Sequence, residues 1–126
     1  MRAPHKPVMR LHLWLETKEG LYFGLGRSQL LKSVQKNRSL KKAAEELGMS
    51  YRAAWGKIKK TEEVMGIRLL EKRDGNRYQV TKEGELFMNC FEQWFEEVER
   101  FALERARSLF PCIPQEFESK PEKSER

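Results

Sequence analysis

Apolar residues change their spacing several times along the chain, and each spacing predicts an element. Three leucines alternate with other residues over positions 11–16, the period of two that is typical of a half-buried strand. A turn follows at residues 18–20, after which residues 21–23 either pair back on that strand or pack on the next helix. Apolar residues then recur at helical spacing over residues 27–36, which predicts the first helix.

Two further helices each follow a serine. The Ser39 hydroxyl can accept a hydrogen bond from a free N–H of the first helical turn, and Gly48 is suited to end that helix. Ser50 and Gly66 bracket the next helix in the same way. The sequence therefore predicts three consecutive helices.

A hairpin and a long helix complete the pattern. Strand-like runs at residues 67–72 and 77–80 flank Asp74 and Gly75, and glycine tolerates the positive φ of a hairpin turn. Thr81 is placed to cap a last helix, which two prolines stop.

This order of elements predicts a mainly α fold with small β elements (α+β). It is the order of a winged helix-turn-helix with an N-terminal strand or hairpin and a long C-terminal helix. We expect a flexible N-terminus at residues 1–10, a winged helix-turn-helix at 11–81, a dimerisation helix at 82–110 and a disordered tail at 111–126.

Residues 39–60 carry the strongest local signal. Two helices that cross steeply with almost no linker need small residues where their axes approach. The segment supplies two alanine pairs, Ala43 with Ala44 and Ala53 with Ala54. Leu47 closes the interior, and Gly48 adopts a backbone conformation that branched residues resist. Together these residues predict a helix-turn-helix whose second helix enters a DNA groove.

The third helix of the chain sorts into two faces at about 100° per residue. The core stripe consists of Ala54, Ile58, Thr61 and Met65. The opposite face is cationic and consists of Arg52, Gly56 and Lys59, flanked by Trp55 and Lys60. Glycine in mid-helix costs about 1 kcal/mol, which indicates that the bare surface at Gly56 serves a close approach to DNA. The alternative is an ordinary solvated face.

Each candidate contact has a role that follows from its chemistry. The planar guanidinium of Arg52 can pair with guanine O6 and N7. Tyr51 and Trp55 either touch bases and the sugar–phosphate wall or stack on each other. Phosphate ligands, which set affinity without specifying sequence, are expected at Ser39, Lys41, Lys42, Ser50 and Lys60. At the hairpin tip Arg73, Asn76 and Arg77 lie along the backbone or in the minor groove, unless the tip is only a charged, solvated turn.

Charge separates the chain into two parts. The formal net charge is +6, but residues 1–82 carry 19 Lys/Arg against 8 Asp/Glu, or +11. Residues 83–126 carry 6 against 11, or −5. A basic body joined to an acidic helix indicates a polyanionic partner for the first part only.

Composition excludes several classes of function. No apolar run approaches the roughly 18 residues of a membrane span, and no signal peptide is recognisable. We therefore expect no membrane partner and a cytoplasmic, prokaryotic protein that is nucleoid-associated when bound. Cys90 and Cys112 lie far apart with no nearby histidine, which predicts no metal and no cofactor; reduced thiols are the simple interpretation and an intersubunit disulfide the alternative. No paired acids, activated nucleophile or phosphate loop indicates an enzyme.

One motif is distinctive: Gly-Met-Ser-Tyr-x-x-Ala-Trp over residues 48–55, preceded by Ser-Leu-x-x-Ala-Ala from Ser39. With the strand and the Leu-Leu helix before it, the segment 11–101 resembles the N-terminal domain of the ModE molybdate-responsive regulators. The chain is also similar to LysR-type DNA-binding domains in Ile58-Lys59-Lys60, in Gly66-Ile67-x-Leu69-Leu70 and in Thr81-x-x-Gly84.

The resemblance implies a homodimer joined by the strand and the long helix, with recognition helices in adjacent major grooves. Full-length ModE regulators continue into molybdate-binding domains, and this chain ends where those would begin. We therefore expect a standalone DNA-binding domain without a molybdate pocket. An effector, if one exists, would act at the dimer interface or through a separate effector-sensing partner protein.

The last helix independently predicts a homodimer. Its wide apolar stripe consists of Phe87, Phe91, Trp94, Phe95, Val98, Phe101 and Ala102. A small winged domain has little core left for so many aromatics, and leaving one exposed costs about 1.5–3 kcal/mol. A partner helix is the predicted solution; the alternative is that the helix folds back across its own domain.

These patterns together predict a sequence-specific transcriptional regulator that binds an inverted repeat in double-stranded DNA as a homodimer. The alternative is an architectural DNA-binding protein or a winged-helix adaptor for protein interactions, since a fold does not fix a function.

Overall fold

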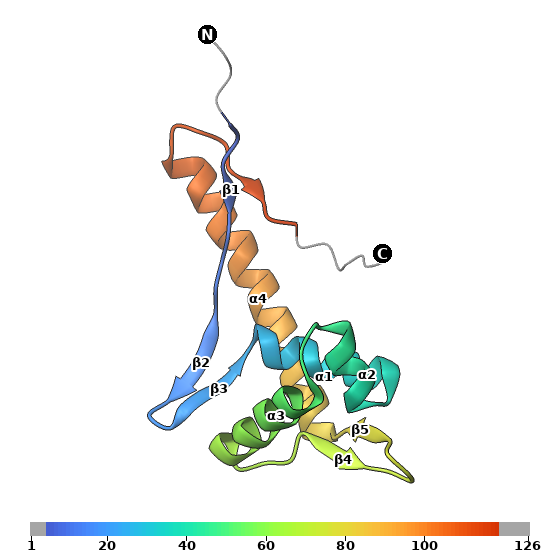
Figure 1. Cartoon of the computed structure of the whole chain (residues 1–126). Helices are drawn as coiled ribbons and strands as arrows, with labels where there is room; N and C mark the ends of the chain where they lie inside the picture. The colour runs from blue at the N-terminus through green and yellow to red at the C-terminus, as the bar shows by residue number, and fades with distance from the viewer. Residues whose placement is uncertain (1–4, 119–126) are drawn as a thin grey trace. The chain divides into compact units, whose positions relative to one another are not determined.

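The computed structural model describes residues 5–118 of the chain and contains two compact units (Figure 1). One is Leu13–Trp94, here named the winged unit; the other, the terminal unit, joins Met1–His12 with Phe95–Arg126. The long helix α4 (Lys82–Leu109) contributes to both. Along residues 5–118, no helix is at once long enough and apolar enough to cross a membrane.

The boundaries of the winged unit differ from those expected at residues 11 and 82. The unit begins at Leu13 and includes α4 as far as Trp94. Met88 and Phe91, in this part of α4, are only 4% and 5% exposed. The first part of α4 therefore packs in the core of the winged unit.

The first hairpin of the winged unit pairs β2 (Trp14–Thr17) with β3 (Gly20–Gly24) in antiparallel fashion. We expected a half-buried strand over residues 11–16, but β2 starts only at Trp14 and its four residues are all exposed. The register shifts between Leu15 and Glu16, and such a bulge interrupts the alternation of faces. Instead β3 carries the hairpin's core residue, Phe23, which is 1% exposed.

Three helices follow: α1 (Leu25–Asn37), α2 (Leu40–Glu46) and α3 (Tyr51–Met65). Both predicted serine caps are confirmed, because Ser39 Oγ accepts a hydrogen bond from the Lys42 N–H and Ser50 Oγ accepts one from the Ala53 N–H, each at 3.0 Å. Gly48 and Gly66 have φ of 72° and 75°, the left-handed conformation that suits the residue after a helix.

The core of the winged unit draws on every one of its helices. Phe23 lies 5.6 Å from Phe87 and 6.0 Å from Phe91, ring centroid to ring centroid. The other buried apolar residues are Leu30, Leu31, Val34, Leu40, Ala43, Ala44, Ala54, Ile58, Leu69, Leu70, Val80 and Met88. Three of the four alanines expected at the helix crossing are thus buried, but Ala53 is exposed. With the helix starting after the Ser50 cap, Ala54 and not Ala53 lies on the inward face of α3.

The wing is the antiparallel hairpin of β4 (Leu70–Lys72) and β5 (Tyr78–Val80). Its first strand is shorter than the predicted run at residues 67–72, because the backbone carbonyls of Arg68 and Leu69 accept hydrogen bonds from Thr81. Thr81 N–H donates to the Leu69 carbonyl at 3.0 Å, and Thr81 Oγ1 donates to the Arg68 carbonyl at 2.7 Å. The same Oγ1 accepts from the Gly84 N–H at 3.0 Å, which confirms Thr81 as the cap of α4.

The terminal unit pairs the two ends of the chain. Strands β1 (Val8–Met9) and β6 (Gln115–Glu116) run parallel, and the Arg10 guanidinium lies 4.1 Å from the centroid of the Phe117 ring. The sequence predicted a flexible N-terminus and a disordered tail here. These strands differ from that expectation; the parts of it that concern residues 1–4 and 119–126 lie outside the described residues.

Glu46 ties the end of α2 to α1. It accepts hydrogen bonds from Lys36 Nζ at 2.5 Å, from Asn37 Nδ2 at 3.1 Å and from Ser33 Oγ. The Lys36 hydrogen bond, followed by that of Ser33, lowers the pKa of Glu46 from 4.5 to about 2.

This pKa predicts a defined loss of stability in acid. A carboxylate with a depressed folded-state pKa stabilises the fold above its unfolded pKa, near 4.5, and loses that contribution as pH falls towards about 2. The group is solvent-accessible, so we expect at most about 1 kcal/mol. In urea unfolding at pH 7, Glu46→Gln should be less stable than the parent, and the gap should narrow as pH falls from about 4.5 towards 2. A gap as large at pH 2 as at pH 7 would contradict the assignment.

Candidate nucleic-acid interface

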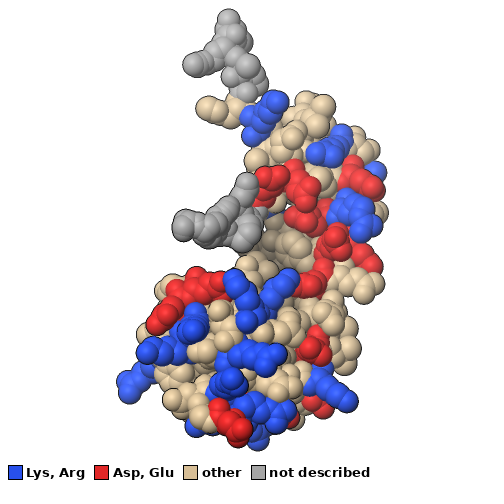
Figure 2. Space-filling model, turned by 90° about the vertical axis from the view of Figure 1, so that its right-hand side faces the viewer, with Lys and Arg blue, Asp and Glu red and all other residues tan. Residues whose placement is uncertain are grey.

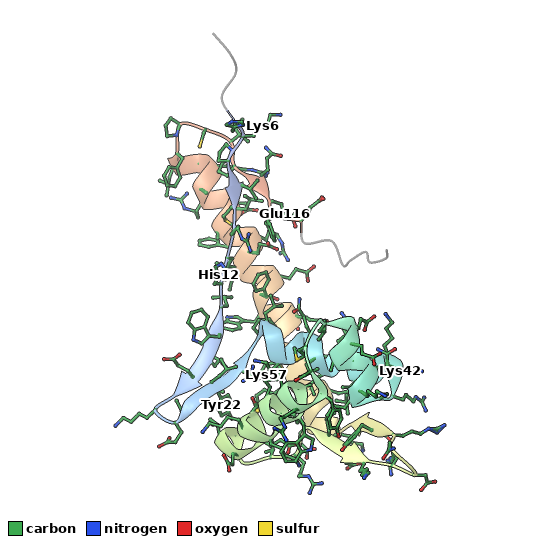
Figure 3. All side chains as sticks on the ribbon, in the orientation of Figure 1. Lys6, His12, Tyr22, Lys42, Lys57 and Glu116 are labelled. Carbon is green, nitrogen blue, oxygen red and sulfur yellow. The ribbon has the colours of Figure 1, made fainter. Side chains whose placement is uncertain are left out.

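The exposed face of α3 is cationic, as predicted. Ala54, Ile58 and Thr61 are at most 2% exposed and fix the inward face of the helix. The remaining side of α3 exposes Arg52, Trp55, Gly56, Lys57, Lys59 and Lys60. Met65, the last member of the predicted core stripe, is only half-buried because it lies in the final turn. Lys57, on α3 in Figure 3, was not among the predicted contacts.

The middle of α3 is open to a close approach. A Cβ built on Gly56 would meet no atom within 4 Å, so no packing inside the described structure explains why glycine stands there. A partner lying against the helix would meet bare backbone at this point. The predicted reason for the glycine, a close approach by DNA, is compatible with this geometry.

The aromatic residues at the start of α3 have separate partners. Tyr51 hydrogen-bonds with Tyr78 of β5, and this bond, followed by partial burial, raises the pKa of Tyr51. Lys59 Nζ lies 5.6 Å from the centroid of the Trp55 ring and 3.4 Å from Glu62 Oε1. Tyr51 therefore links α3 to the wing, and the Trp55 ring contacts a lysine of the exposed face.

Glu62 is a site residue that the sequence analysis missed. It is 9% exposed, and its Oε2 accepts hydrogen bonds from the backbone N–H groups of Leu69 at 2.7 Å and Leu70 at 3.2 Å. A buried carboxylate at the end of α3 thus fixes the start of β4. This contact positions the wing relative to α3. The only sign of it in the sequence is an acidic residue next to the core residue Thr61.

The predicted wing residues are exposed, but they are not equally free. Arg73 Nε donates to Gln79 Oε1 at 2.6 Å, and its guanidinium lies 3.5 Å from Glu71. Asn76 and Arg77 are exposed at the tip, where Gly75 has a φ of 68°. Arg73 therefore stabilises the hairpin through these contacts, whereas Arg77 is an exposed cation at its tip.

A basic groove joins α2 to the wing. It has a volume of about 520 Å³ and is lined by Lys36, Asn37, Arg38, Ser39, Lys42, Asn76 and Arg77. Figure 3 shows Lys42 on α2, and Figure 2 shows Lys and Arg gathered over the winged unit. No acidic residue lines the groove, and Arg38 was not among the predicted contacts. Lys41, by contrast, is exposed but does not line it.

The apolar stripe of α4 divides between the two units. Phe87, Phe91 and Trp94 lie in the winged unit, where Phe91 packs between Phe23 and Trp94. The prediction that Phe91 lies in a dimer interface is wrong, because its own domain covers it and leaves it only 5% exposed. In the terminal unit Phe95, Val98 and Ala102 are half-buried, and Phe101 is 64% exposed.

Metal ligation has no support in the described part of the chain. Among residues 5–118, no three His, Cys, Asp or Glu side chains are grouped so that they could hold an ion. Cys90 and Cys112 are free thiols, both exposed. The chemistry available at the exposed face of α3 and in the groove is that of cations, amides and hydroxyls.

Three helices with α3 exposed beside a two-stranded wing define a winged helix-turn-helix protein. Residues 25–85 match the family model of the bacterial regulatory helix-turn-helix proteins of the lysR family. This segment is therefore similar to the DNA-binding helix-turn-helix of that family. A comparison with curated proteins found no match.

Several solved structures are similar to this chain. The complex of the BenM DNA-binding domain with benA site 1 DNA is similar at 26% identity and a TM-score of 0.55, over 68% of this chain and 99% of that chain. A full-length BenM variant aligns at 25% identity and a TM-score of 0.56, over 71% of this chain but 29% of that one. The complex of the CbnR DNA-binding domain with DNA shares the fold at 22% identity and a TM-score of 0.53, over 66% of this chain and 93% of that chain.

Proposed function

We propose that this protein is a sequence-specific transcriptional regulator that binds an inverted repeat in double-stranded DNA as a homodimer. In this proposal α3 lies in the major groove, Arg52 contacts a base edge, and Lys59 and Lys60 contact phosphates. Two copies would place two recognition helices in successive grooves, about 34 Å apart or a multiple of that distance.

The observation that carries this proposal is the exposed face of α3. It combines exposed cations with bare backbone at Gly56, and the buried Ala54 and Ile58 hold the helix in a fixed orientation. The similar domain of BenM was solved on DNA. An adaptor for protein interactions would have no use for a cationic helix face next to a basic groove.

An electrophoretic titration with an operator duplex and a scrambled duplex distinguishes a specific regulator from an architectural protein. We expect the operator to bind at least about a thousandfold more tightly. Equal affinity, with a steep salt dependence for both duplexes, would instead indicate architectural binding.

The homodimer is proposed from the exposed part of α4. Phe101 is 64% exposed, and Phe95, Val98 and Ala102 of the same stripe are only half-buried. Covering Phe101 in a dimer would remove a large apolar surface from water on both copies. The terminal unit is therefore the part of the chain for which we propose the partner contact.

Replacement of Phe101 by serine should weaken the dimer by at least about tenfold, because each large apolar side chain covered contributes about 1.5–3 kcal/mol. Sedimentation velocity over a concentration series measures the change. Leu86→Ser is the matched control, since Leu86 is 58% exposed on the same helix but lies outside the stripe. A monomeric parent protein, or equal dissociation constants for parent and Phe101→Ser, would contradict this interface.

A narrower link to ModE-type regulators remains a prediction from residues 48–55. In this narrower proposal the operators lie beside molybdenum-related genes, and a separate partner protein senses any effector. Mapping the bound sites on the genome of origin tests it.

A further inference from the structure

A cavity of about 280 Å³ lies between the end of α1, the wing and the start of α4. Gln35 of α1, Tyr78 of β5 and Glu85 of α4 contribute to its walls, all within the winged unit. The basic groove described above opens on α2 instead, although Arg38 and Arg77 line both. Ligand sites commonly have volumes of about 300–1,000 Å³, so this cavity suits a small molecule.

Hydrogen bonds of the fold join the walls of this cavity. The Tyr78 N–H donates to the carbonyl of Arg38 at 3.2 Å, which ties β5 to the residue that caps the end of α1. Gln35 Nε2 donates to Glu85 Oε2 at 2.9 Å, which ties α1 to α4. Val80, which also lines the cavity, is only 7% exposed and belongs to the core. The cavity is therefore formed before a ligand arrives, as small-molecule sites usually are.

The cavity holds charges of both signs that do not pair with each other. Arg38, Arg77 and Glu85 line it and are exposed, whereas Arg73, a further lining residue, is held by its contacts within the wing. Within residues 5–118, no oppositely charged group lies within 4.0 Å of the charged atoms of Arg38, Arg77 or Glu85. The cavity therefore offers two guanidinium groups and one carboxylate whose charges the protein has not neutralised at short range.

We propose that this cavity binds a small acidic amino acid, whose two carboxylates pair with Arg38 and Arg77 and whose ammonium group pairs with Glu85. The charges are then complementary, since the amino acid carries two negative groups and one positive group where the protein carries the reverse. A guanidinium donates two parallel hydrogen bonds to one carboxylate, which gives the contact a defined orientation. The methylene groups of the amino acid would lie against Tyr78 and Val80.

This proposal goes beyond the proposed function and does not depend on it, because it concerns a small molecule and its test contains no DNA. The bound amino acid would join three elements of the winged unit. Arg38 follows α1, Arg77 lies in the wing and Glu85 lies on α4. The binding site is therefore a point at which one small ligand would link the wing to the long helix.

Titration of the full chain with L-glutamate and with L-aspartate tests the proposal, followed by calorimetry and by the amide signals of a nitrogen-15-labelled protein. We expect saturable binding of at least one of them, with shifts centred on the N–H groups of Gln35, Arg38 and Tyr78. Glutarate keeps both carboxylates of glutamate but lacks the ammonium group, and L-glutamine lacks the second carboxylate. Each should bind at least about tenfold more weakly than glutamate, as for a lost charge-assisted hydrogen bond. Succinate and L-asparagine are the matching pair for aspartate.

Two variants assign the groups of the amino acid to their partners. Glu85→Gln keeps an acceptor oxygen for Gln35 but removes the charge, so it should weaken the amino acid by at least about tenfold and leave the dicarboxylate unaffected. Arg38→Gly should weaken both, and glycine adopts the φ of 55° found at this position without strain. Glu83→Gln, which neutralises an exposed acid in the same turn of α4, should change neither affinity.

Three results would overturn the proposal. The first is that neither L-glutamate nor L-aspartate binds saturably to the parent protein. The second is that the dicarboxylate or the amide binds as tightly as the acidic amino acid, which would make the cavity a site for simple anions or for amino acids in general. The third is that Glu85→Gln and Glu83→Gln bind the amino acid with the affinity of the parent.

Discussion

Replacement of Glu62 by alanine is expected to lower the free energy of unfolding by about 2–4 kcal/mol, because it leaves two buried N–H groups without an acceptor. Those groups belong to Leu69 and Leu70, whose side chains are 0% and 5% exposed, so water cannot easily replace the carboxylate. Equilibrium urea unfolding followed by tryptophan fluorescence measures the loss.

Two matched variants separate this effect from a general loss of charge. Glu62→Gln keeps an acceptor oxygen but not the charge, so we expect a smaller loss of about 1 kcal/mol. Glu63→Ala removes the neighbouring exposed acid and should change stability by less than about 0.5 kcal/mol. If Glu62→Ala and Glu63→Ala were equally stable, Glu62 would not be what holds the start of the wing.

Replacement of Arg52 by alanine is expected to remove base preference at one position of each half-site, at a cost of about 1–3 kcal/mol per position. The reason is that Arg52 is exposed in the first turn of α3, the part of the helix that contacts base edges in helix-turn-helix complexes. Affinity measured on all four base variants at each operator position gives the result.

Lys42→Ala is the contrasting variant for this experiment. Lys42 lies in the first turns of α2 and lines the basic groove, so its loss should weaken all sequences alike and make the salt dependence shallower by about 0.9. Identical behaviour of Arg52→Ala and Lys42→Ala would contradict the division between base contact and phosphate contact.

Features that depend on near neighbours could be predicted from the sequence. The caps at Ser39, Ser50 and Thr81 involve partners three residues away, and the structure confirms each of them. The core and exposed faces of α3 follow from helical periodicity alone. The winged helix-turn-helix was predicted for the same reason, since its helices, turns and wing have local signals.

Features that join residues far apart in the sequence could not be predicted from it. The pairing of Val8 and Met9 with Gln115 and Glu116 connects opposite ends of the chain, and neither strand is long enough to show a period. The role of Arg38 depends on the Tyr78 N–H that fixes its carbonyl, a contact across 40 positions of sequence.

The apolar stripe of α4 shows a further limit. Periodicity indicates that Phe91 and Phe101 share a face, but it does not say what covers each. Phe23, from a hairpin whose own alternation is interrupted, supplies the cover for Phe91. For the part of α4 around Phe91, the structure fits the alternative interpretation, in which the helix packs on its own domain rather than on a partner.

Selection of duplexes from a random-sequence library, followed by sequencing of the bound pool, tests the central claim most directly. The claim is that α3 distinguishes base sequences as part of a dimer. We predict enrichment of one inverted repeat whose half-site centres lie about 10 base pairs, or a multiple, apart. We also predict that Arg52→Ala selects a motif degenerate at one position in each half. A bound pool that keeps the base composition of the starting library after repeated rounds would contradict the account.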